Sequence, residues 1–186
     1  YYKAPELTAA VLDADGWYYT GDLGTLDERG YLRIVGRKKD MIIRGGQNIF
    51  PIEIEHFLLT HPKVDEAAVV GVPGGIGDES VWAFVRLKEG AVASERELLD
   101  FVRGAIASYK VPDVIRTVSE LPHTSTGKVP KYQLVQRALE RIIARARLVS
   151  GSQSVGDEVE RQLKRRLDTW LREATRPVSV QWFDEQ

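Results

Sequence analysis

Three short segments hold the residues most able to do chemistry. Tyr19-Thr20-Gly21-Asp22 ends in a carboxylate that can accept both hydroxyls of a ribose, although Gly-Asp is also ordinary turn chemistry. Residues 36–55 begin with a charged run and contain Gly45-Gly46, a pair typical of a tight turn or of a backbone that a ligand approaches closely. In residues 121–131, Lys128 follows a loop of Thr, Ser and Gly. Each segment alone is weak evidence, because a plain structural explanation also fits it.

The Gly127-Lys128 pair does not belong to a P-loop. That motif needs glycine five residues before Gly127 and Ser or Thr after the lysine, whereas this chain has Pro122 and Val129 at those positions. Taken alone, a lysine on such a loop is most often a solvated surface charge. The segment therefore does not predict a nucleotide site of the P-loop kind.

Composition limits the classes of partner. With 26 basic and 27 acidic residues the formal net charge is -1, which gives no electrostatic case for nucleic acid or an anionic membrane. Cysteine is absent and the three histidines show no ligand spacing, so no metal site is expected. No apolar run approaches the roughly 18 residues of an integral membrane segment. A chain without cysteine suits a reducing compartment, so we expect a cytoplasmic protein.

Hydrophobic patterning predicts an α+β fold in three parts. The parts are residues 1–36, the compact domain of residues 37–140, and a helical extension of residues 141–186. Within the first part, residues 11–36 are expected to form a β-meander, with strands at Trp17–Thr20 and Tyr31–Val35. The polar run from Gly36 to Asp40 marks the boundary with the compact domain. Because the chain starts at Tyr1 rather than Met, we expect an internal fragment.

The compact domain should mix short strands and helices. The expected strands are Met41–Ile43, Ala67–Val72, Ser80–Leu87 and Val114–Val118, and the expected helices begin at Pro51, at the capping box Ser94-Glu95-Arg96-Glu97 and near Leu134. In Ser80–Leu87, Val81 and its alternate neighbours should face one way, and Trp82 and Phe84 the other.

The extension should hold a linker and a last helix. Residues 150–156 have linker composition. Beyond them, one face of an arginine-rich helix should carry the apolar residues Val159, Leu163, Trp170 and Leu171. We expect this helix to pack on its own protein, or else to contact a second copy in a homo-oligomer. A membrane-surface role is the least favoured alternative, because the apolar stripe is too short for stable anchoring.

Together the three segments closely resemble the late motifs of the adenylate-forming superfamily of acyl-CoA synthetases, luciferases and nonribosomal peptide adenylation domains. The matching segments are 17–22, 36–55 and 121–131, in the family's order and separation, and Tyr109-Lys110-Val111-Pro112 also resembles a family segment. The resemblance implies that residues 37–140 are the small C-terminal domain of the adenylate-forming fold. Residues 1–36 would then be the end of a large N-terminal domain, which is the chain's expected partner.

The resemblance also implies a reaction for the complete enzyme. Family members convert a carboxylic acid and ATP to an acyl-adenylate and pyrophosphate, and then pass the acyl group to a thiol. The expected cofactors are ATP, CoA and Mg²⁺, although no Mg²⁺ ligand can be assigned in this chain. The fragment alone should be inactive, because the phosphate-binding loop and the acyl pocket would lie in the large domain. For the same reason the carboxylic acid is left open among fatty, alicyclic and aromatic acids.

Individual roles follow by position. Asp22 would bind the ribose hydroxyls of ATP, with Arg37 assisting at the ribose, and Lys39 would be the hinge on which the small domain turns between half-reactions. Lys128 matches the mobile catalytic lysine that reaches the carboxylate and the α-phosphate, and the Gly45-Gly46 loop would line the approach of the CoA pantetheine. A cation delivered on a flexible stem suits adenylation, since two anionic groups must meet there.

Two alternatives stay open beside a CoA ligase. One is an adenylation domain that loads a carrier protein, but residues 140–186 hold no carrier attachment motif of the Gly-Gly-x-Ser kind. The other is a freestanding non-catalytic module that binds a nucleotide or a partner protein. Retention of both Asp22 and Lys128 argues against that module, so the acyl-CoA synthetase is favoured.

Overall fold

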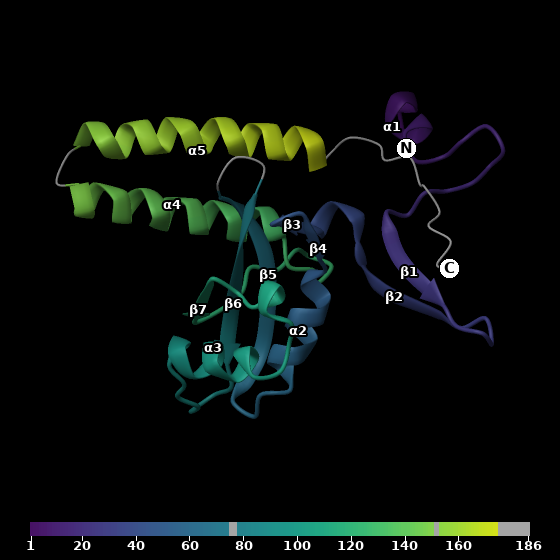
Figure 1. Ribbon diagram of the computed structural model, residues 1–186. Coiled ribbons are helices and arrows are strands. Elements are labelled where there is room, and N and C mark those ends of the chain that lie inside the picture. Colours follow the sequence, from purple (N-terminus) through teal and green to yellow (C-terminus); the bar gives the residue numbers. More distant parts are fainter. Residues whose placement is uncertain (75–77, 151–152, 175–186) are drawn as a thin grey trace.

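The computed structural model describes residues 1–74, 78–150 and 153–174 (Figure 1). Its helices are α1 Pro5–Ala9, α2 Pro51–Leu59, α3 Glu95–Arg103, α4 Lys131–Ser150 and α5 Gln153–Ala174. Its strands are β1 Asp22–Leu26, β2 Leu32–Arg37, β3 Ile42–Arg44, β4 Gln47–Ile49, β5 Val64–Pro73, β6 Glu79–Leu87 and β7 Val114–Val118. No helix among these described residues is long and apolar enough to cross a membrane.

The centre of the domain is a three-stranded sheet in the order β5-β6-β7. β5 is antiparallel to β6, and β7 is parallel to β6 because α3 provides the crossover between them. Side chains alternate across β6 as predicted: Val81 packs with the core on one face of the sheet, and Trp82 and Phe84 pack with the core on the other. The sheet is therefore covered on both faces, which confirms the α+β class.

Helices α2 and α3 cover the first face. Pro51 occupies the first turn of α2, and Ile54 and Leu58 are fully buried there. The predicted cap of α3 is present, since the Ser94 hydroxyl accepts a hydrogen bond from the backbone N–H of Glu97 at 3.0 Å. The fully buried Leu98 of α3 packs against the same core. These contacts hold α2 and α3 against one face of the sheet.

Helices α4 and α5 cover the second face as an antiparallel pair (Figure 1). Leu134 and Ala138 of α4 are fully buried, and Leu163 of α5 is 9% exposed in the same core, with Val159 packed against it. The predicted linker 150–156 is partly wrong, because Gln153 already begins α5. The extension therefore completes the core through Val159 and Leu163. The side chains of Trp170 and Leu171 lie outside the described residues.

The β1–β2 hairpin projects away from this body (Figure 1). The predicted strand at Trp17–Thr20 is wrong: only one isolated bridge, Leu12 to Tyr18, occurs there. The Asp13 carboxylate instead accepts hydrogen bonds from the backbone N–H of Trp17 and from the Tyr19 hydroxyl, which shapes a local turn. Several large side chains of this part are exposed, including Trp17, Leu26, Tyr31 and Leu32.

Candidate functional site

Asp22 and Arg37 are brought together by strand register. They are opposite partners at the ends of β1 and β2, and Arg37 Nε donates to Asp22 Oδ1 at 2.6 Å. This hydrogen bond raises the pKa of Arg37 above its ordinary value, because the carboxylate favours the charged guanidinium. Both side chains are partly exposed, at 42% for Arg37 and 32% for Asp22. The second carboxylate oxygen of Asp22 is thus presented on an accessible surface as a hydrogen-bond acceptor.

Lys39 lies in the connection between this hairpin and the domain. It is the exposed middle residue of a 3-10 turn, Lys38–Asp40, that joins β2 to β3. The backbone N–H of Lys38 donates to the carbonyl of Gly21 at 2.9 Å, so the turn starts against the β1 strand. A Cβ added at Gly36 would lie 3.1 Å from the Phe50 ring, which shows how closely the end of β2 approaches the domain.

The Gly45-Gly46 pair forms the tip of the β3–β4 hairpin. Both glycines have positive φ, 55° and 75°, which side-chain-bearing residues rarely adopt. A Cβ at either position would have nothing within 4 Å, so the tip is open on its outer side. The tight turn that the glycine pair predicted is therefore present.

The hairpin is tied to the body by acidic side chains. The Asp78 carboxylate accepts the backbone N–H of Gly45 at 2.8 Å, and the Glu79 carboxylate accepts that of Ile43 at 2.7 Å. Arg44 pairs with Asp113 at 2.7 Å and donates to a backbone carbonyl of the same segment. These four long-range polar contacts therefore set the position of an exposed two-strand element.

Lys128 ends a tight loop that closes on Thr124. The Thr124 N–H donates to the carbonyl of Lys128 at 2.9 Å, and its hydroxyl accepts the N–H of Lys128 at 3.2 Å. Gly127 supplies the positive φ of 78° that the turn requires. The Lys128 side chain is exposed, and within the described residues no hydrogen bond or ion pair joins it to Asp22 or Arg37. The loop is built by its backbone, which leaves the ammonium group available.

Comparison with known proteins decides the family. Residues 53–128 match the model of the AMP-binding enzyme C-terminal domain. The chain belongs to this family. It is 47% identical over 140 residues to a long-chain-fatty-acid–CoA ligase of Bacillus subtilis, a match that covers 75% of this chain and 25% of the ligase. It is 46% identical over 134 residues to the human mitochondrial medium-chain acyl-CoA ligase ACSF2, covering 72% of this chain and 22% of that protein.

Solved structures agree with this adenylate-forming family. ATP-bound MatB from Rhodopseudomonas palustris superimposes with a TM-score of 0.68 at 41% identity, covering 74% of this chain and 27% of MatB. Apo MatB superimposes over the same shares with a TM-score of 0.56. The chain thus has the fold of the small domain and spans about a quarter of the length of the curated relatives it matches.

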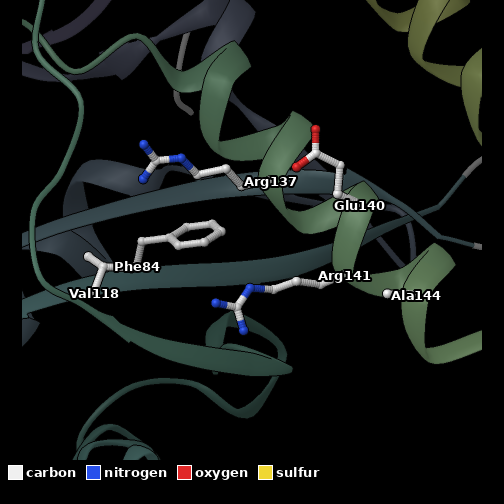
Figure 2. A pocket seen from close by; sticks show the side chains of 6 residues that line it. All are labelled: Phe84, Val118, Arg137, Glu140, Arg141 and Ala144. Atoms are coloured by element: carbon white, nitrogen blue, oxygen red, sulfur yellow. The ribbon is translucent and has the colours of Figure 1, made fainter. Parts of the chain in front are cut away.

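One open hollow lies apart from the AMP-binding motifs. It has a volume of about 440 Å³ and is lined by Phe84, Val118, Arg137, Glu140, Arg141 and Ala144. Figure 2 shows Arg137 and Arg141 on successive turns of α4, with the Phe84 ring between their side chains. None of the residues predicted for the site lines it. Across the described residues, no group of three His, Cys, Asp or Glu side chains is arranged to hold a metal ion.

Sequence reasoning missed the residues that support the predicted site. Asp78 and Asp113 hold the β3–β4 hairpin, and Glu55 and Glu66 contact residues on either side of the Lys128 loop. Each contacts a partner 33 to 76 positions away, as with Asp78 and Gly45 or Glu55 and Lys131. No local spacing rule connects residues so far apart, so only the folded chain reveals them.

Proposed function

We propose that the chain is the C-terminal part of an ATP-dependent, AMP-forming acyl-CoA synthetase. The observation that carries the proposal is the Asp22–Arg37 pair. Strand register brings the two residues together, and both precede the AMP-binding C-terminal domain in the chain. In the first half-reaction a carboxylate oxygen would attack the α-phosphorus of ATP and pyrophosphate would leave. In the second, the CoA sulfur would attack the acyl carbonyl carbon and AMP would leave.

The ribose role of Asp22 has a geometric basis. Arg37 occupies one carboxylate oxygen of Asp22 at 2.6 Å, which fixes the orientation of the carboxylate. The other oxygen would then accept hydrogen bonds from the vicinal hydroxyls of a nucleotide ribose. Arg37 keeps its charge throughout, so it can also donate a hydrogen bond to an oxygen atom of the nucleotide.

Lys128 would supply charge during adenylation. Its backbone is held by Thr124 while its side chain is exposed, so the ammonium can enter a site on the large domain without unfolding the loop. There it would offset the negative charge that grows as a carboxylate attacks a phosphate. Mg²⁺ would accompany ATP and neutralise its phosphate oxygens.

Lys39 would be the hinge between the two arrangements. It lies in a three-residue turn between the β1–β2 hairpin and the rest of the domain, so a change in its backbone angles would rotate one against the other. The lower TM-score to apo MatB than to ATP-bound MatB, at nearly equal identity, supports a matched region that changes shape between states. The Gly45-Gly46 tip would then line the passage for pantetheine, with the exposed 1–36 surface facing the large domain.

The test uses the complete enzyme with ATP and a panel of fatty, alicyclic and aromatic acids. Acid-dependent release of pyrophosphate, followed by CoA-dependent formation of AMP and thioester, is the expected result. Failure of every acid to release pyrophosphate overturns the proposal. Adenylate that forms but is not discharged by CoA, and is discharged by a carrier protein's phosphopantetheine, would assign the chain to carrier loading instead. Fractionation of cells tests the expected cytoplasmic location. Light scattering of the enzyme with and without α5 tests the possible homo-oligomer through this helix.

A further inference from the structure

Two loops of the domain are fastened to its body by different side chains. The loop of Lys128 is fastened near one end of β6, and the β3–β4 hairpin with Gly45-Gly46 is fastened at the other end. Between Glu79 and Arg86, β6 extends about 23 Å at 3.3 Å a residue. Such spacing lets each loop be held without reference to the other.

We propose that the side chains that make these contacts form two independent sets of positioning residues, one for each half-reaction. The set around the Lys128 loop positions the ammonium for adenylation, and the set around the β3–β4 hairpin positions the glycine tip for thioester formation. This inference rests on the proposed function. It adds residues to the mechanism that touch neither ATP nor CoA and act through Lys128 or through the hairpin.

The first set brackets the Lys128 loop on both sides. Before the loop, His123 Nε2 contacts Glu66 Oε1 at 2.5 Å, and Glu66 is itself held by Arg86 at 3.1 Å. After the loop, Lys131 Nζ pairs with Glu55 Oε1 at 2.9 Å. Lys131 opens α4, where a cation is disfavoured by the helix dipole, so the Glu55 carboxylate compensates for its placement.

Glu55 is also fixed by the sheet. Its Oε1 accepts the backbone N–H of Val69 at 2.8 Å, and β5 is an edge strand of the three-stranded sheet. The side chain of Glu55 is only 17% exposed, so its position is well defined. The start of α4 is thereby tied to the sheet edge, and the Lys128 loop spans two fixed points.

The second set fastens the β3–β4 hairpin. Asp78 holds Gly45, Glu79 holds Ile43, and Asp113 holds Arg44, each at 2.7 or 2.8 Å. Gly71 leaves the room that Glu79 needs, because a Cβ there would lie 2.6 Å from a Glu79 carboxylate oxygen. Asp113 also accepts the N–H of Val81, so the contact reaches into β6.

The two sets act within the domain and not between domains. All their residues lie between Ile43 and Lys131, so both sets would move as one body when the domain rotates. Neither set would therefore choose between the two orientations. Each set would instead restrict the range of positions of one loop after the domain has rotated into place. The reacting groups would then be correctly aligned more often in that half-reaction alone.

The test separates the half-reactions in the complete enzyme. Adenylate formation is measured in a single turnover with ATP and acid, and thioester formation with pre-made acyl-adenylate and CoA. His123→Ala should slow adenylation about two- to fivefold, the effect of losing a partly exposed hydrogen-bond contact, and leave thioester formation unchanged. Asp78→Ala should slow thioester formation by about three- to tenfold and leave adenylation unchanged.

Further variants distinguish positioning from stability. His123→Arg keeps a hydrogen-bond donor opposite Glu66 and should recover the adenylation rate. Lys63→Ala removes the ion pair with Glu97 elsewhere in the domain and should leave both half-reactions unchanged. If His123→Ala and Asp78→Ala each slow both halves equally, or if His123→Arg fails to recover the rate, the residues are structural only and the inference is wrong.

Failure of this inference is distinct from failure of the proposed function. Wild-type enzyme that makes no adenylate with any acid overturns the acyl-CoA synthetase assignment, and with it this inference. Active wild type, with Lys128→Ala defective and both His123→Ala and Asp78→Ala normal in both halves, overturns only the two positioning sets.

Discussion

Replacement of Lys128 by alanine is the most direct test of the mechanism, because the structure separates the role of its backbone from that of its side chain. The loop closes through the N–H and carbonyl of Lys128, which bond to Thr124 at 3.2 and 2.9 Å. Alanine keeps both groups. The exposed side chain contributes no contact that the fold needs, so the free energy of unfolding should change by less than about 0.5 kcal/mol.

The effect on chemistry should be far larger. If the ammonium stabilises the charge that develops as the acid attacks ATP, its removal deletes one preorganised electrostatic group. Such a loss costs about 2.7–4 kcal/mol in the transition state, or about 10²–10³ in the rate of adenylation. Thioester formation from pre-made acyl-adenylate should proceed at the normal rate, because the lysine is expected to have left the site by then.

The assay is single-turnover rapid quench of each half-reaction in the complete enzyme, with unfolding followed in parallel. Lys88→Ala is the matched control, since Lys88 is another exposed lysine of the domain and donates to the carbonyl of Pro62 rather than to a carboxylate. The reasoning is refuted if Lys128→Ala slows both halves to the same extent. It is also refuted if the variant unfolds as easily as a core truncation, because the lysine would then be structural.

Other variants probe the hinge, the extension and the surface charges. Lys39→Pro fixes its own φ and disfavours helical geometry at Lys38, so adenylation should persist and thioester formation should fail in single-turnover measurements; normal thioester rates would contradict the hinge. Leu163→Ala should lower the denaturant-derived stability of the chain by about 2–4 kcal/mol, because Leu163 lies in the core, and an unchanged midpoint would show that α5 does not pack there. The hydrogen bond from Lys63 lowers the pKa of Glu97, so its stabilising effect is present above the ordinary value of about 4.3 and is lost as the pH falls below it. Glu97→Gln should therefore lower the melting temperature at pH 7 and not at pH 3, and an equal drop at both would refute this origin.

The elements that could be predicted are those whose formation depends on local sequence patterns. Period-two alternation in Ser80–Leu87 predicted which residues enter each core, and Pro51 and the Ser94 capping box predicted two helix starts. The missed strand Gln47–Ile49 has no such pattern, because its three residues form a strand only by pairing with Ile42–Arg44. The expected strand Trp17–Thr20 failed for the converse reason: its aromatic side chains favour a strand, but a strand also needs a backbone partner.

The candidate site also contains residues that the sequence could predict and residues that it could not. Asp22, Arg37 and Lys128 could be named from the sequence because their motifs resemble a family, and register then explains why Asp22 meets Arg37 across the β1–β2 pair. Their chemical roles are still predictions, since geometry alone does not assign a ligand. The supporting carboxylates could not be named at all, because a glutamate such as Glu66 in a strand gives no sign of the histidine 57 positions later that it will contact.

Glu66 also explains why loop position and stability can be separated in this domain. It accepts Arg86 through one carboxylate oxygen and His123 through the other. When His123 is removed, Glu66 keeps its arginine partner, so no buried charge is left unpaired and the core contacts of β5 and β6 are unchanged. The Lys128 loop then loses the contact that fixes one of its two ends, while the sheet keeps all of its backbone and core contacts. A domain built in this way can lose precision at the catalytic lysine with little loss of fold, so activity is the more sensitive measure of these contacts.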